Sequence, residues 1–98
     1  MRYQDVVANV QCELLVDDVQ LVILKPRQER GAEPNLLGFR PNGELVWQLT
    51  PPVRSLDSWD GFVNLWIREG KPWVSSWSGF SLRIDPQSGE VVEQLFTK

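Results

Sequence analysis

The sequence lacks the residues from which most active sites are built. It contains no histidine, which removes the commonest general base and the commonest imidazole ligand for metals. Its single cysteine, Cys12, has no second thiol for an intramolecular disulfide and no histidine to activate it. Glycine-rich phosphate loops are missing, and the acidic pairs Asp17-Asp18 and Asp57-x-x-Asp60 lack the spacing of a calcium loop. We therefore expect no catalysis, no cofactor and no metal.

Clustered positive charge and long apolar runs are also absent. The 98 residues carry 10 basic and 13 acidic side chains, a net charge of -3, and the arginines are scattered. Nucleic-acid binding requires a clustered basic surface, so that class of partner is not expected. The longest aliphatic run, Leu21 to Leu24, is too short to span a membrane, and no apolar signal segment opens the chain. These features predict a cytoplasmic protein without a membrane partner.

Two stretches of the chain share one layout, which indicates an internal repeat. Asn35 to Leu49 and Phe80 to Leu95 each contain an alternating strand and a Pro…Gly turn. In both, a Gly-Glu-apolar-Val-x-Gln-Leu strand then runs back. We expect a single domain with repeat halves at about residues 10–50 and 61–97, joined by a connector at residues 51–60.

Short alternating segments bounded by turn residues predict four strands in each half. The expected strands are Val10–Val16, Val19–Lys25, Asn35–Arg40, Glu44–Thr50, Phe62–Arg68, Trp73–Ser78, Phe80–Asp85 and Glu90–Phe96. Cys12 lies between Val10 and Leu14 on the expected inward face of the first strand, so we expect a buried, apolar thiol. Met1 to Asn9 fits a helix or a strand, and we favour an extended lead-in. The predicted fold is all-β, with two four-stranded antiparallel meanders.

The second half resembles a blade of a quinoprotein-type β-propeller. Trp77-Ser78-Gly79 stands where such blades carry a W-x-G turn, and Asp85 to Val92 follows their D-x-x-S-G-E-V pattern. Trp47 in the first half takes the place of the closing Trp, whereas Glu93 stands there in the second half and Arg40 replaces the Asp. The chain is also similar to small uncharacterised bacterial proteins with the same repeats, some of which are associated with toxin–immunity gene neighbourhoods.

Two blade-like repeats cannot close a propeller by themselves, because propellers typically have four or more blades. The meanders can instead pack face to face as a sandwich, curl into one barrel, or form part of a propeller completed by further copies. We expect a self-contained sandwich or barrel, since a chain of this length can bury one core. A monomer and a small homo-oligomer both remain open.

The candidate binding residues fall mainly in two polar segments, because function tends to lie on loops held by a rigid scaffold. One is the loop from Arg27 to Pro34, which has no counterpart of equal length in the second half. The other is the connector around Trp59. Trp47, Trp66 and Trp77 are expected in the core. The proposed contact residues are Arg27, Glu29, Arg30, Glu33, Asp57, Trp59, Asp60 and Trp73.

Two function classes follow from these residues. The first is a non-enzymatic protein-interaction module, either an adaptor or an immunity-like protein, with a protein partner at the two polar segments. The alternative is a carbohydrate-binding, lectin-like domain assembled as an oligomeric propeller, since small fucose-binding lectins build propellers from two-repeat chains. There a sugar would stack on Trp59, Trp73 or Trp77 and bond to Asp57, Asp60 or Arg83. A hydrolase with paired carboxylates ranks far behind both.

Overall fold

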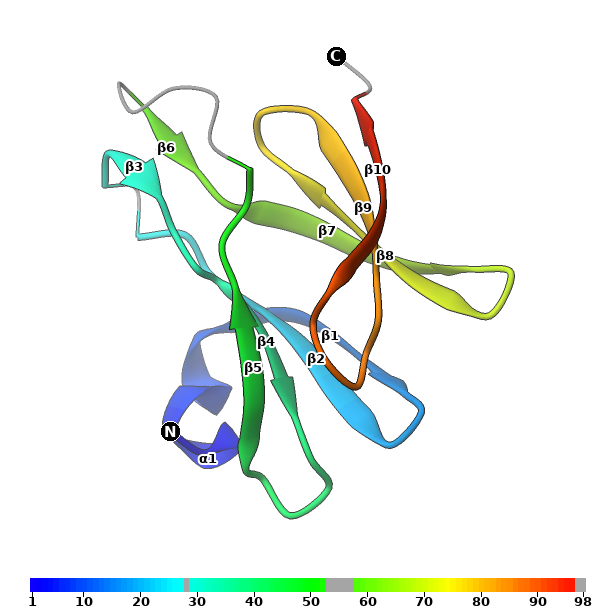
Figure 1. The fold of residues 1–98 in the computed structure, drawn as a ribbon. Coiled ribbons are helices and arrows are strands. Elements are labelled where there is room, and N and C mark those ends of the chain that lie inside the picture. Colours follow the sequence, from blue (N-terminus) through cyan, green and yellow to red (C-terminus); the bar gives the residue numbers. More distant parts are fainter. Residues whose placement is uncertain (28, 53–57, 97–98) are drawn as a thin grey trace.

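Two four-stranded antiparallel sheets make up the body of the protein (Figure 1). The computed structural model describes residues 1–27, 29–52 and 58–96. The first sheet has the order β1-β2-β4-β5 and the second the order β10-β9-β8-β7, so each sheet comes from one half of the sequence. The predicted all-β fold of two four-stranded meanders is therefore confirmed.

The strands of the first sheet are β1 (Val10–Val16), β2 (Val19–Leu24), β4 (Leu36–Phe39) and β5 (Leu45–Leu49). Those of the second are β7 (Phe62–Arg68), β8 (Lys71–Ser76), β9 (Phe80–Ile84) and β10 (Val91–Phe96).

Two-residue turns open each meander. Asp17 and Asp18 connect β1 to β2 with φ angles of 49° and 63°, and Val16 pairs with Val19 across the turn. Glu69 and Gly70 connect β7 to β8 with φ angles of 52° and 75°. Positive φ at both central residues defines the turn whose twist matches that of the flanking strands. Both turns lie between strands that the sequence predicted.

The central core lies between the facing sheets. Its fully buried side chains include Leu21 and Ile23 from β2, Phe62 from β7 and Leu82 from β9, each no more than 1% exposed. A fully buried side chain of this kind stabilises the fold by about 1.5–3 kcal/mol. Because both halves supply the same core, the arrangement is a sandwich.

Trp47 of β5, in the first sheet, contacts the β9–β10 turn of the second sheet. Its ring packs against Gly38 of β4 and Gly89 of the β9–β10 turn, and its indole N–H donates to the Pro86 carbonyl at 2.8 Å. A Cβ atom at Gly38 would stand 2.5 Å from the ring, and one at Gly89 would stand 2.6 Å from it. Both positions therefore require glycine, and the prediction that Trp47 lies in the core is confirmed.

A second core covers the opposite face of the first sheet. It contains Val6, Val22, Leu37 and Phe39, and the Tyr3 ring lies 5.7 Å from the Phe39 ring. The predicted extended lead-in is wrong, because the chain begins with α1 (Tyr3–Val6) and the 3₁₀ turn η1 (Val7–Asn9). No helix in the described part of the chain is long and apolar enough to cross a membrane.

The two polar segments meet in a small parallel pair of strands. Strand β3 (Gly31–Ala32) lies in the Arg27–Pro34 segment and β6 (Trp59–Asp60) lies in the connector. Both segments were expected to be plain loops. Their pairing forms an arm beside the two sheets (Figure 1).

Two of the tryptophans expected in the core lie elsewhere. Trp66 stacks on Trp73 at 6.4 Å on the face of the second sheet that points away from the core, and Trp77 is 60% exposed. The prediction for Trp66 fails because β7 has a register shift between Phe62 and Asn64. Beyond this shift, Leu65 faces the core on the same side as Phe62. Trp66 consequently points outward.

Candidate functional site

Glu33 joins two other predicted contact residues, Arg27 and Trp59. Its Oε1 atom accepts hydrogen bonds from the Arg27 backbone N–H at 3.0 Å and from the Trp59 indole N–H at 2.9 Å. The Arg27 Nε atom lies 3.8 Å from the same oxygen. Glu33 is 8% exposed, so its carboxylate is a buried hydrogen-bond acceptor that links the two segments. The structure therefore brings the two polar segments together, as a shared site would require.

The β3–β6 pair positions this cluster. The Gly31 N–H donates to the Ser58 carbonyl at 3.1 Å, and the Glu33 N–H donates to the Asp60 carbonyl at 2.8 Å. Asp60 is buried, and its Oδ1 atom accepts from the Ser78 N–H at 3.2 Å. Its Oδ2 atom is buried without a hydrogen bond among the described residues. Asp60 thus braces the arm against the second sheet.

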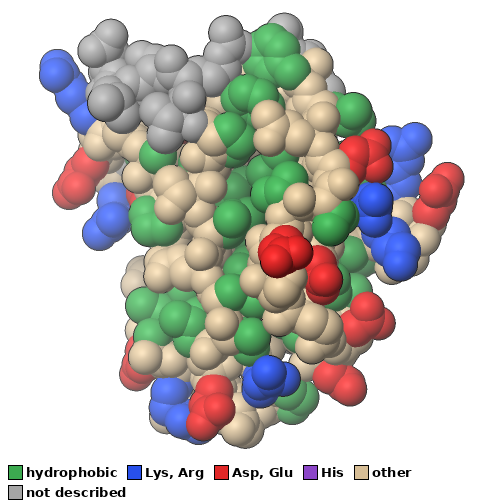
Figure 2. All heavy atoms as spheres, viewed as in Figure 1, with side chains coloured by type: hydrophobic (Ala, Val, Ile, Leu, Met, Phe, Trp, Pro, Cys, Tyr) green, Lys and Arg blue, Asp and Glu red, His purple; other side chains and the backbone are tan. Residues whose placement is uncertain are grey.

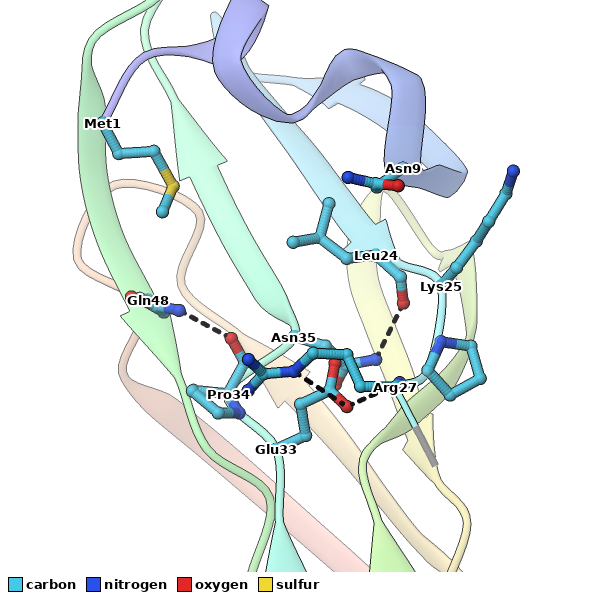
Figure 3. Close-up of a pocket in the computed structure, with 10 residues that line it drawn as sticks. Met1, Asn9, Leu24, Lys25, Arg27, Glu33, Pro34, Asn35 and Gln48 are labelled. Carbon is cyan, nitrogen blue, oxygen red and sulfur yellow. Dashed lines mark hydrogen bonds and ion pairs between the residues drawn. The ribbon is translucent and has the colours of Figure 1, made fainter. Parts of the chain in front are cut away.

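A cavity of about 350 Å³ opens beside Glu33 (Figure 3). The Asn35 amide, which lines this cavity, already makes hydrogen bonds within the protein. Asn35 donates from Nδ2 to the carbonyls of Leu24 at 3.1 Å and Phe62 at 2.9 Å, and its Oδ1 atom accepts from the Phe62 N–H at 2.8 Å. The lining residues are Met1, Asn9, Leu24, Lys25, Pro26, Arg27, Glu33, Pro34, Asn35 and Gln48. The Asn35 amide and the Oε1 atom of Glu33 thus bond to the protein itself, and these atoms hold the cavity wall in place.

The other predicted residues that the structure describes are Glu29, Arg30 and Trp73. Glu29 and Arg30 are exposed in the Arg27–Pro34 segment, and Asp57 lies outside the described residues. Trp73 lies on the second sheet and is 5% exposed, with Trp66 stacked on it and the Arg68 guanidinium 5.9 Å from its ring centre. A ring covered in this way offers no face to a sugar. Trp59 is half-buried, and its indole N–H is bonded to Glu33.

Strand β10 carries the surface that the sequence reading missed. All six of its residues are exposed, and four of them are large and apolar: Val91 41%, Val92 46%, Leu95 42% and Phe96 49%. It lies at the edge of the second sheet, with β9 as its partner. Figure 2, in the orientation of Figure 1, shows hydrophobic side chains at the surface on the side where β10 lies in front. No local sequence signal shows which strand lies at the edge of a sheet.

Two titratable groups, Tyr3 of α1 and Cys12 of β1, have raised pKa values. The Tyr3 hydroxyl donates to the Glu13 carboxylate at 2.8 Å, and this hydrogen bond is the main cause that raises the pKa of Tyr3 above 10.0. Burial, followed by the charge of Glu13, raises the pKa of the Cys12 thiol above 9.0. Cys12 packs against the central core but is only half-buried, so its expected inward direction is confirmed and full burial is not.

Comparison with known proteins gives one finding. The family model described as a domain of unknown function, DUF7957, matches residues 5–96. No curated protein and no solved structure matches the chain. The matched range runs from α1 to the last residue of β10 and so contains both sheets and the arm. The chain therefore belongs to the DUF7957 family.

Proposed function

We propose that this chain is a non-enzymatic protein-interaction module of the cytoplasm, with an adaptor or immunity-like role, and that it binds its partner along β10. The observation that carries the proposal is the exposure of four large apolar residues on one edge strand. Edge strands are usually protected by charge, proline or covering segments, because their backbone groups can pair with another chain. An exposed apolar edge is the feature that strand addition uses in peptide recognition.

The other edge of the second sheet supports the choice of β10. At the start of β7, the side chain of Asn35 occupies both the N–H and the carbonyl of Phe62. A new strand therefore cannot pair with Phe62 at this end of β7. In β10, Glu93 is the single charged residue, and Arg83 of β9 lies 3.4 Å from its carboxylate. The partner we infer is an extended polypeptide segment with apolar side chains at alternating positions.

A matched pair of variants tests this function. Leu95→Lys places a charge on β10, and Leu15→Lys makes the same change at a residue of β1 that is 67% exposed. The tagged proteins would be used to capture partners from a host lysate that also contains the untagged chain. We expect a protein that is bound by the wild type and by Leu15→Lys but not by Leu95→Lys. Recovery of the same proteins by all three baits, or of none, would overturn the proposal.

Sugar binding is supported by one residue, Trp77, whose side chain is 60% exposed, whereas Trp59 and Trp73 are covered. This second proposal predicts hits on a glycan array that disappear in Trp77→Ala. An array without hits would contradict it.

A further inference from the structure

We propose that the cavity beside Glu33 binds a zwitterionic α-amino acid with an aliphatic side chain. The cavity has a volume of about 350 Å³, at the lower end of the range for small-molecule sites. None of the described residues that line it belongs to β10, so this site is separate from the proposed partner surface. The inference therefore goes beyond the proposed function and does not depend on it.

Glu33 supplies an acceptor for the ammonium group of such a ligand. Its Oε1 atom accepts two hydrogen bonds from the protein, whereas its Oε2 atom accepts none within the described part of the chain. Among these residues, the Oδ2 atom of Asp60 is the unpartnered side-chain oxygen that is sealed from solvent, so Oε2 is open to the cavity that Glu33 lines. A carboxylate oxygen without a donor is costly in a side chain that is 8% exposed. An ammonium group removes that cost with a charge-assisted hydrogen bond.

The Arg27 guanidinium supplies donors for the carboxylate of the ligand. Its Nε atom lies 3.8 Å from the Oε1 atom of Glu33, and the Arg27 side chain is 67% exposed. The two terminal nitrogens make no hydrogen bond to any described residue, and together they form a fork that matches a carboxylate. Figure 3 shows this side chain folded back toward Glu33, whereas the Lys25 side chain points away from the cavity. A negative and a positive group thus lie side by side, which is the arrangement that an α-amino acid complements.

The opposite wall of the cavity suits an apolar side chain. Leu24 is half-buried, and Figure 3 shows Leu24 and Met1 pointing into the cavity. Pro26 and Pro34 add apolar surface whose backbone is fixed by the proline rings. A pair of opposite charges beside such a wall favours an aliphatic amino acid over a charged one.

Isothermal titration calorimetry with L-leucine tests the class of ligand. Leucinamide lacks the carboxylate and 4-methylpentanoate lacks the ammonium group, so each analogue tests one of the two charged contacts. We expect leucine to bind at concentrations up to about 10 mM, and both analogues to bind about tenfold more weakly or worse. No binding of leucine, or an equally strong response to either analogue, would overturn the proposal.

Two variants with matched controls locate the site. Glu33→Gln keeps an oxygen for the Arg27 and Trp59 donors but replaces the second oxygen by an amide group, so the fold should be kept and leucine binding lost. Its control is Glu29→Gln, at an exposed residue of the same segment. Arg27→Gln should weaken leucine binding by about tenfold or more, whereas Arg30→Gln, also at an exposed residue of this segment, should leave it unchanged.

Circular dichroism and urea unfolding of each variant would show whether the fold is kept. Leucine binding that survives in a folded Glu33→Gln variant, or that Arg27→Gln and Arg30→Gln weaken alike, would overturn the inference. The capture experiment on β10 does not involve these residues, so its outcome is distinguishable from failure of the amino-acid site.

Discussion

Replacement of Asn35 by alanine should destabilise the protein more than any exposed polar substitution. Asn35 is 1% exposed, and its side chain satisfies both backbone groups of Phe62 as a neighbouring strand would. The Asn35→Ala variant leaves the Phe62 N–H and carbonyl without these partners. A buried group left unsatisfied costs about 1–3 kcal/mol, so two such groups cost about 2–6 kcal/mol. Water entering from the adjacent cavity reduces this cost, and we expect a loss of about 2–4 kcal/mol.

That loss is a large share of the total, because a domain of this size is stable by about 5–15 kcal/mol. Urea unfolding followed by tryptophan fluorescence would measure it as a lower midpoint with an unchanged slope. Asn64→Ala is the control, since Asn64 is exposed on β7, the strand of Phe62, and accepts one local hydrogen bond from the Leu65 N–H. Its effect should stay within about 0.5 kcal/mol.

An aspartate at position 35 extends the test to pH. Asn35→Asp keeps the acceptor for the Phe62 N–H but directs a carboxylate oxygen at two carbonyls. Burial raises the pKa of such a carboxyl above its unfolded value, so the variant should regain stability relative to the wild type as the pH falls toward about 4. A loss below about 1 kcal/mol in Asn35→Ala, or an Asn35→Asp variant that is insensitive to pH, would refute the account of Asn35 as a brace.

Three further predictions follow from the packing and acidities. Gly38→Ala should lower the free energy of unfolding by about 1–3 kcal/mol, because the new methyl group would displace the Trp47 ring, and near-UV circular dichroism should change with it. An unchanged spectrum and midpoint would contradict that packing. Tyr3 is the single tyrosine, so absorbance titration should give a pKa above 10.0 that Glu13→Ala lowers. The Tyr3–Glu13 hydrogen bond should stabilise the fold below pH 10, and this stabilisation should be lost as the pH rises through the folded-state pKa of Tyr3. Identical titration curves for the wild type and Glu13→Ala would refute the interaction. Cys12 should react with a thiol reagent at pH 8 more slowly in the folded protein than in urea, because burial raises its pKa, and equal rates would argue against that burial.

The sequence predicted the strands well because their signals are local. Turn residues such as Asp17-Asp18 and Glu69-Gly70 bound each hairpin, and alternation locates the strands between them. The short N-terminal helix escaped prediction, since four residues contain too little periodicity to be read. Its helical form is favoured by tertiary packing, in which Val6 and Tyr3 reach the same apolar face of the first sheet.

The candidate site was predicted in part. The Arg27–Pro34 segment and the connector do meet, but through Glu33 and the β3–β6 pair, which depend on contacts distant in sequence. The outward position of Trp66 depends on a bulge in β7 that cannot be predicted from the residue pattern. The exposure of β10 depends on strand order, because the same apolar residues would be buried in a central strand. Local sequence patterns therefore predicted where the strands lie. Long-range strand pairing determined which faces of those strands are exposed.

Hydrogen exchange along β10 tests the central claim most directly. In an unoccupied edge strand, the amides that point away from β9 should exchange rapidly, and a partner that adds a strand should protect them. The account predicts that Val91–Phe96 gains protection as the concentration of a captured partner is raised. It also predicts no such change in β1, the edge of the first sheet. Exchange in β10 that stays fast under saturating partner, or protection that appears elsewhere instead, would contradict the claim that β10 is the binding surface.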